Sequence, residues 1–359
     1  MARPIVASLF VLTLGVPAFG ADLPRAPADT AQEPPAEAVE PRAPVFTDRL
    51  DVELETLVLR VVDRRGLAIA GLGPGDFRLF VGRRELPLES ADWISAAAPQ
   101  TGGALLEPGS EELGPLPGQL VVVFVQTDLQ ASRLHGLVQM LPKLKRVLDG
   151  LAPEDHVAVV SFDSHLKLRQ EFTRDRERID AALEEAVRLG PAPARRRTVP
   201  EPSLAAHLDP GEARRAANPE RALELVARAI EPLEQPRVLI YLGWGLGEMA
   251  RLATRLPPEY FAAVESLTRS RTSVFVLDAT VAEYHSLELG LRQVARDTGG
   301  SYEKTVDFPE LVADRLTGAI VGHYVLAFRP PAGSSGAPIR VELREPGLGR
   351  VLMPAGVAR

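Results

Sequence analysis

The chain has 359 residues, 45% of them apolar, and a formal net charge of −7 at pH 7. This length is sufficient for a large hydrophobic core and a smaller companion domain. The net negative charge argues against nucleic acid as a partner, and a count of zero cysteines excludes disulfide bonds and a lipid-modified cysteine.

The N-terminus has the pattern of a cleavable export signal. Residues 1–20 carry Arg3 and then a mainly apolar run from Ile5 to Leu14, and they end in small residues. A core helix is the alternative for such a run, but the Pro/Ala-rich residues 21–46 that follow lack a hydrophobic period and predict a disordered leader. We therefore expect an exported protein, periplasmic or extracellular. No later segment approaches the roughly 20 apolar residues of a membrane span.

The residues after the leader predict a small β-module, placed at 48–95, followed by a linker at 97–118. The turn Asp63-Arg64-Arg65-Gly66 separates the first strand from the next. The linker is rich in Gly, Pro, Ser and Glu, with few apolar residues. Strands are indicated by apolar positions in three segments, 51–61, 77–81 and 86–93.

Residues 119–320 alternate strands with helices. The predicted strands are 120–125, 156–162, 166–172, 237–242 and 273–278. The predicted helices are 133–149, 175–188, 219–233, 247–269, 286–298 and 307–320. This repeated order predicts an α/β fold, a doubly wound and mostly parallel sheet covered by helices on both faces, with 166–172 as an antiparallel edge strand.

The last segment, 321–359, returns to strand periodicity at 323–328, 339–343 and 351–352. A β-module of about 50 residues is marginally stable alone. We therefore predict that these C-terminal strands complete the module begun at 48–95, which would combine strands from both ends of the chain in two sheets.

Several strands and short phrases carry a resemblance to a known family. The strands are 120–125, 155–162, 237–242 and 273–278, and the phrases are Gly75-Asp76-Phe77, Val276-Leu277-Asp278-Ala279, Thr298-Gly299-Gly300 and Tyr324-Val325-Leu326-Ala327-Phe328. In order and spacing they resemble von Willebrand factor A domains, and more narrowly the exported bacterial group related to them. The resemblance covers most of residues 48–345. It implies a Rossmann-like fold that binds a protein partner at the crest, the edge at which the parallel strands end.

The resemblance also implies positions for a metal ion, and here those positions are altered. Metal-binding members carry Asp-x-Ser-x-Ser after the first strand, a Thr before a later helix and an Asp after the fourth strand, oxygen ligands that suit Mg²⁺. The first three positions fall on Gln126, Asp128 and Gln130, the last falls on Trp244, and no Thr precedes the helix near Asn218-Pro219. One carboxylate with neutral amides makes a poor magnesium site, so we expect a degenerate adhesion site without metal or another cofactor. The alternative is an unorthodox Mg²⁺ site that uses Asp128 and Gln130.

The segment Gly243-Trp244-Gly245-Leu246-Gly247-Glu248 allows two interpretations. It lies between a strand and a helix, as a dinucleotide-binding loop does. A tight turn is favoured, because Glu248 occupies the third glycine position and Asp278 lies too far along for the ribose-binding acid. Trp244 would either anchor a partner at the crest or fill the space of the missing ion.

Groups typical of enzymes are not arranged in the sequence as catalysis requires. Six histidines, at 135, 156, 165, 207, 285 and 323, have no metal-ligand spacing, and no Gly-x-Ser-x-Gly elbow indicates a hydrolase. We predict that all six are lone surface or strand-end residues. Arg195-Arg196-Arg197 predicts a solvated loop, with an acidic partner or an anionic envelope surface as the alternative.

Together these patterns predict a non-enzymatic, adhesion-like protein. It would bind a protein partner through the crest loops 126–133, 190–218 and 243–250. The candidate contact residues are Gln126, Asp128, Gln130 and Trp244. Metal-dependent adhesion is the alternative function, and an enzyme that uses the same crest is a distant third.

Overall fold

The computed structural model describes residues 54–95, 118–191, 202–250, 253–306, 308–331, 333–334 and 336–354. The predicted export signal, the leader, nearly all of the linker and the Arg195-Arg196-Arg197 loop lie outside the described residues. Among the residues that are described, no helix combines the length and apolar character that crossing a membrane requires.

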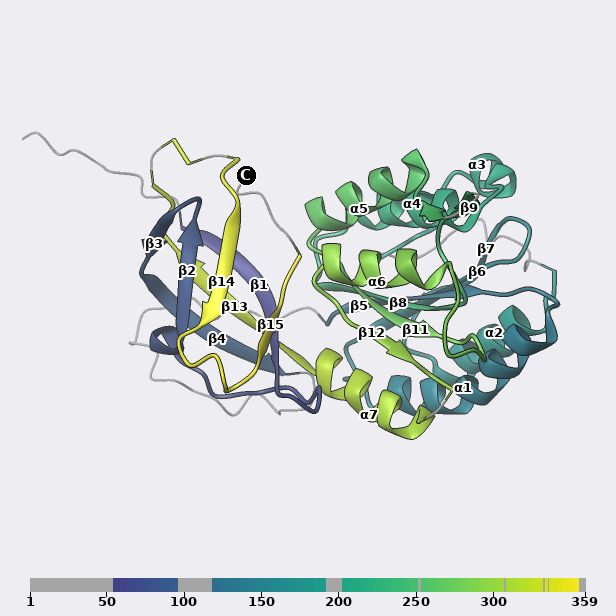
Figure 1. Cartoon of the computed structure of the whole chain (residues 1–359), viewed down its shortest axis with the longest axis horizontal. Helices are drawn as coiled ribbons and strands as arrows, with labels where there is room; N and C mark the ends of the chain where they lie inside the picture. The colour runs from purple at the N-terminus through teal and green to yellow at the C-terminus, as the bar shows by residue number, and fades with distance from the viewer. Residues whose placement is uncertain are drawn as a thin grey trace, which may run out of the picture. The chain divides into compact units, whose positions relative to one another are not determined.

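A six-stranded sheet forms the centre of the larger domain (Figure 1). In spatial order its strands are β12 (Tyr302–Lys304), β11 (Ser273–Asp278), β8 (Arg237–Gly243), β5 (Leu120–Gln126), β6 (His156–Phe162) and β7 (Leu166–Thr173). Every neighbouring pair is parallel except β6 with β7, which is antiparallel. The doubly wound sheet with an antiparallel edge strand, predicted from the sequence, is confirmed.

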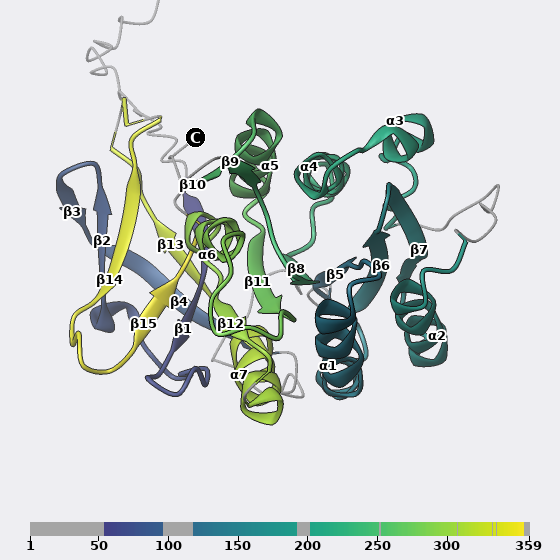
Figure 2. The same cartoon turned by 45° about the vertical axis from the view of Figure 1, so that its right-hand side comes forward.

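Helices cover both faces of this sheet, as Figures 1 and 2 show. One face is covered by α1 (Ala131–Asp149), α2 (Arg176–Val187) and α7 (Pro309–Ile320), and the other by α3 (Pro210–Arg215), α4 (Pro219–Ile230), α5 (Pro258–Arg269) and α6 (Glu288–Asp297). Alternate residues of the central strand β5 enter the two cores: Val121, Val123 and Val125 face one, and Leu120, Val122 and Phe124 the other. A strand buried on both faces explains why this segment is continuously apolar.

The strand order determines where the crest lies. In chain order the strands occupy positions 3-2-1-4-5-6, so the direction of winding reverses between β5 and β8. The carboxyl ends of these two neighbours therefore diverge into loops that run to opposite faces. The arrangement places the loops after β5, β8 and β11 at one edge of the sheet.

The β-module is a sandwich of two antiparallel sheets. Its first sheet has the order β15 (Arg350–Leu352), β1 (Glu55–Val62), β13 (Gly322–Phe328) and β4 (Leu88–Ser95), and its second the order β14 (Ile339–Leu343), β2 (Phe77–Val81) and β3 (Arg84–Leu86). A single cluster fills the space between them, built around Leu59, Phe77 and Tyr324. The prediction that both ends of the chain build this module is confirmed.

One element differs from the sequence prediction. The periodicity of residues 247–269 predicts one helix, but a hairpin of β9 (Glu248–Ala250) and β10 (Ala253–Arg255) precedes the shorter α5. Gly247 has φ +104°, a left-handed conformation that a helix does not contain, and Pro257-Pro258 determines where α5 starts. The short elements β12 and α3 have no sequence signal strong enough to predict them.

The β-module contains a buried pair of basic side chains. Arg60 of β1 is 3% exposed, its guanidinium carbon lies 5.7 Å from the ring centroid of Phe275 in β11, and its Nε has no hydrogen-bond partner among the described residues. His323 of β13 is 6% exposed and its Nε2 is also without a partner there. Burial, together with the charge of Arg60, lowers the pKa of His323 to about 3. His323 is therefore neutral in the folded protein at neutral pH.

This burial predicts a pH dependence of folding. The unfolded chain takes up a proton on His323 near the ordinary histidine pKa of 6.5, whereas in the folded chain burial lowers that pKa to about 3. Stability is therefore full above pH 6.5 and falls as the pH drops from 6.5 toward 3, by up to about 1.4 kcal/mol per pH unit. The free energy of unfolding of wild type and of His323→Leu can be measured in urea at about pH 7.5 and at pH 5. Between these two pH values, wild type should lose about 2 kcal/mol more than the variant. Parallel losses in the two proteins would contradict the expectation.

Candidate functional site

Gln126, the last residue of β5, binds the loop that follows β8. Its side-chain oxygen accepts hydrogen bonds from the Tyr241 hydroxyl at 2.9 Å and from the backbone N–H groups of Trp244 at 3.0 Å and Gly245 at 3.1 Å. The side chain is fully buried. Gln126, which the resemblance places at the first metal-ligand position, thus directs its side-chain oxygen at three protein donors. These hydrogen bonds hold the end of β5 to the loop after β8.

This closure requires a glycine at position 243. A Cβ on Gly243 would lie 2.7 Å from the Gln126 side-chain oxygen and 2.6 Å from the Tyr241 ring. Neither neighbour is free to move, since Gln126 and Tyr241 are both fully buried. The glycine therefore lets the amide approach the loop, which is a packing reason for the Gly-Trp-Gly sequence.

Asp128 and Trp244 are connected through Arg133, a residue that the sequence does not single out. Asp128 accepts a hydrogen bond from the backbone N–H of Gln130 at 2.8 Å and forms an ion pair with Arg133 in the first turn of α1. The Arg133 guanidinium carbon lies 3.5 Å from the ring centroid of Trp244, a cation–π contact. Trp244 is half-buried beneath this guanidinium, so it neither stands open to solvent nor sinks fully into the core.

Polar atoms left over at the crest do not suit a cation. Gln126 Nε2, Thr127 Oγ1 and Trp244 Nε1 are buried without a hydrogen-bond partner among the described residues. Two of these atoms are N–H donors, which repel a metal ion and fit an oxygen acceptor or an ordered water instead. With Asp128 paired to Arg133, the residues present do not fit a Mg²⁺ site.

The crest loops expose apolar side chains. Leu129 follows β5 and is 80% exposed, Met249 follows β8 and is 66% exposed, and Tyr284 follows β11 and is 80% exposed. Thr254 donates a hydrogen bond to the backbone oxygen of Ser286, which fastens the β9–β10 hairpin to the β11–α6 loop. Of the predicted contact residues, only Gln130 is exposed, next to Leu129 in the chain.

A second polar network lies at the end of β11. Asp278 Oδ2 accepts hydrogen bonds from the Tyr302 hydroxyl at 2.6 Å and from His285 Nε2 at 2.7 Å, and its Oδ1 accepts from the backbone N–H of Thr280. Burial disfavours the charge, but these hydrogen bonds outweigh burial and hold the pKa of Asp278 below its usual value. His285 is therefore partnered, in contrast to the lone histidine expected from the sequence. The signal is local but weak, an acid at a strand end with a histidine in the next loop.

Asp278, His285 and Glu288 together could be considered as metal ligands, because their ligand atoms lie within 4.8 Å of one another. The carboxylate oxygens are already occupied, however. Glu288 is paired with Arg292 and with Lys304 at 3.1 Å, and two cations at this carboxylate oppose a third. The network is electrostatically complete without an ion.

Other predicted positions play structural roles. Asn218, near which the Thr ligand is missing, caps α4 by accepting a hydrogen bond from the Arg221 backbone at 2.7 Å. Glu220, in the first turn of the same helix, is buried and accepts from the backbone N–H of Gly247. Burial raises the pKa of Glu220 despite that hydrogen bond. Glu220 thus positions the loop after β8, whereas Asn218 fixes the start of α4.

Comparisons of the sequence with models of known protein families and with curated proteins give no match. A comparison of structures finds the conserved hypothetical protein BatB from Bacteroides thetaiotaomicron, with 18% identity, TM-score 0.38, and coverage of 56% of this chain and 97% of that one. It also finds a von Willebrand factor type A protein from Catenulispora acidiphila, at 13% identity and TM-score 0.39 over 81% of this chain and 75% of that one. The vWF domain of the type V pili tip protein Mfa5 from Porphyromonas gingivalis has 10% identity and TM-score 0.38, over 57% and 96% of the two chains. These likenesses concern the fold and carry no information on a ligand or partner.

The hydrogen bonds of Gln126 predict a large effect of its removal. Gln126→Ala would leave the Tyr241 hydroxyl and two backbone N–H groups without their acceptor, and we expect a loss of about 3 kcal/mol in the free energy of unfolding. The control, Gln130→Ala, removes an exposed amide and should change stability by less than about 0.5 kcal/mol. Equal effects in urea unfolding would contradict this role of Gln126.

Proposed function

We propose that this protein is an exported, non-enzymatic interaction protein that binds a protein partner through the crest of its A-like domain without a bridging metal. The observation that carries the proposal is the exposure of Leu129, Met249 and Tyr284 on three successive loops at one edge of the sheet. Large apolar side chains exposed on neighbouring loops of a folded domain suit a protein-binding site. The resemblance of the sequence to von Willebrand factor A domains agrees with an adhesive role.

The chemistry of the partner follows from what the crest exposes. Asp128 and Arg133 neutralise each other, and Asp278 lies buried beneath His285 and Tyr302. Little unpaired charge is therefore directed at a partner by these groups. We infer a partner that presents an apolar patch. The exposed amide of Gln130 and the hydroxyl of Tyr284 would add polar contacts to this interface.

Metal-dependent adhesion would require a different arrangement of the same residues. Asp128 would have to leave Arg133, and the Gln126 oxygen would have to leave three donors. At the crest, no serine or threonine hydroxyl among the described residues hydrogen-bonds to His285 to serve as an activated nucleophile.

Independence from metal has a direct measurement. The thermal midpoint in EDTA should equal that in millimolar Mg²⁺, Mn²⁺ or Ca²⁺. A site filled to 100 times its dissociation constant in the folded state alone would add about 2.7 kcal/mol of stability. A saturable rise in the midpoint that Asp128→Asn abolishes would replace the proposal with metal-dependent adhesion.

Partner binding is tested in two stages. A photoreactive residue at Gln130 should crosslink a specific protein from the exported fraction of the source cells, and the same residue at Leu54 in the β-module should not. With that protein purified, Leu129→Ala/Tyr284→Ala should weaken binding by at least tenfold, since each buried apolar side chain contributes about 1.5–3 kcal/mol. The control Leu54→Ala/Leu348→Ala removes exposed apolar side chains of the β-module.

The expected control result is unchanged affinity. Equal crosslinking from Gln130 and Leu54, or equal loss of affinity in the two double variants, would show that the crest is not the interface. Affinity that survives EDTA and moderate salt would agree with a contact based on apolar burial.

A further inference from the structure

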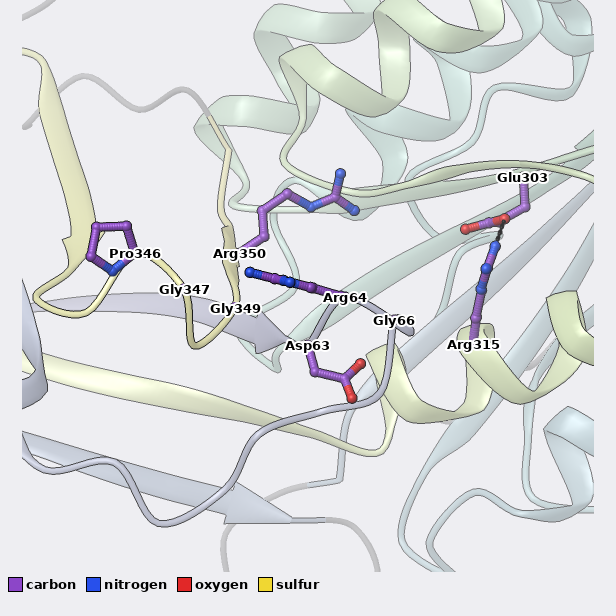
Figure 3. A pocket seen from close by; sticks show the side chains of 9 residues that line it. All are labelled: Asp63, Arg64, Gly66, Glu303, Arg315, Pro346, Gly347, Gly349 and Arg350. Carbon is purple, nitrogen blue, oxygen red and sulfur yellow. Dashed lines mark hydrogen bonds and ion pairs between the residues drawn. The ribbon is translucent and has the colours of Figure 1, made fainter.

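A cavity of about 380 Å³ lies away from the crest, between loops of the β-module and the α7 and β12 elements of the larger domain (Figure 3). The turn after β1 supplies Asp63, Arg64 and Gly66. The loop before β15 supplies Pro346, Gly347 and Gly349, and β15 itself supplies Arg350. Glu303 of β12 and Arg315 of α7 complete the wall. Pockets at domain junctions are frequent ligand sites, and this volume is at the lower end of the range for small molecules.

Of the three arginines around this cavity, one is paired with an acid and two have no ion pair among the described residues. Arg315 donates to Glu303 at 2.9 Å and to the backbone oxygen of Arg65 at 3.1 Å, so that pair is neutral and fixed. Arg64 and Arg350 line the cavity, are exposed, and have no ion pair or side-chain hydrogen bond with the described residues; Figure 3 shows both side chains on the segments that border it. Two like charges around one cavity raise each other's electrostatic energy, which an anion between them would lower.

The acid on the same turn does not neutralise these two arginines. Asp63 Oδ1 accepts hydrogen bonds from the backbone N–H groups of Arg65 at 2.8 Å and Leu67 at 2.9 Å. That side chain serves the turn, which brings Arg64 to the cavity. With three arginines and two acids, the lining keeps an excess of one positive charge.

Glycines keep the space between the charged groups open. Gly66 has φ +85°, and a Cβ there would lie 2.9 Å from Cγ of Arg315. A Cβ on Gly349 would lie 2.5 Å from the backbone oxygen of Val62. Gly347 also lines the cavity, with no atom near its Cβ position. Gly66 therefore lets the turn pack against the Arg315 side chain, Gly349 lets its loop approach the backbone of β1, and Gly347 leaves open space in the lining.

We propose that this cavity binds a small dianion, a phosphate monoester or a dicarboxylate, between the guanidinium groups of Arg64 and Arg350. Guanidinium groups pair with phosphate and carboxylate oxygens through two parallel N–H donors each. Two such groups match two negative charges. The volume exceeds that of a bare ion, so a small organic anion fits better than inorganic phosphate alone.

The experiment is isothermal titration of the full-length protein with glycerol phosphate, succinate and inorganic phosphate at constant ionic strength. Saturable binding of at least one dianion at a single site is expected. Arg64→Gln/Arg350→Gln should weaken that binding at least tenfold. The control Arg83→Gln/Arg84→Gln removes the same charge from exposed positions at the β2–β3 turn and should leave the affinity unchanged.

The three ligands distinguish the sources of the negative charge. Preference for glycerol phosphate identifies an organic phosphate, preference for succinate a dicarboxylate, and tightest binding of inorganic phosphate the free ion; each supports a dianion site. Absence of saturable binding by all three, or an equal loss in both double variants, would overturn the proposal. Circular dichroism of each variant without ligand establishes that a loss does not come from unfolding.

Discussion

The side-chain oxygen of Gln126 is the acceptor that organises the crest. It lies at the end of the central strand, at the point where the winding of the sheet reverses, and it holds the loop after β8 through three donors. A neutral amide can do this without the charge that a carboxylate would bury. The loops of the crest are therefore brought together by the protein's own groups, and no ion is required for this.

Two aspartates of the crest, Asp128 and Asp278, are paired within the protein. Arg133 joins Asp128 to the Trp244 ring, and Asp278 is satisfied by His285 and Tyr302. The exposed side chains that remain on these loops are largely apolar. In the proposed function, recognition at this surface would depend on removal of apolar area from water, a short-range effect that salt screens little.

The β-module presents a contrasting chemistry. Its first sheet is completed when the first and last strands of the described chain, β1 and β15, pair. Arg64 follows β1 and Arg350 begins β15, and both line one cavity. Arg60, in contrast, is buried over an aromatic ring beside a neutral histidine. The molecule thus offers an apolar surface at the crest and a cationic cavity elsewhere, two sites that would select different ligands.

The helices and strands and their order follow from the sequence, whereas the contacts between polar side chains are decided by the tertiary structure. Continuous apolar strands alternating with amphipathic helices allow few arrangements other than a doubly wound sheet, and the sequence at 126–130 shows that Gln126, Asp128 and Gln130 stand at the positions that the resemblance assigns to metal ligands. Nothing in the local pattern links Arg133 to Trp244, or Arg64 to Arg350, because each contact depends on how loops from different strands fold over one edge or one junction. Hydrophobic periodicity specifies which face of an element is buried. The direction of a polar side chain on a loop is set instead by the hydrogen bonds and charges that reach it from elsewhere in the fold.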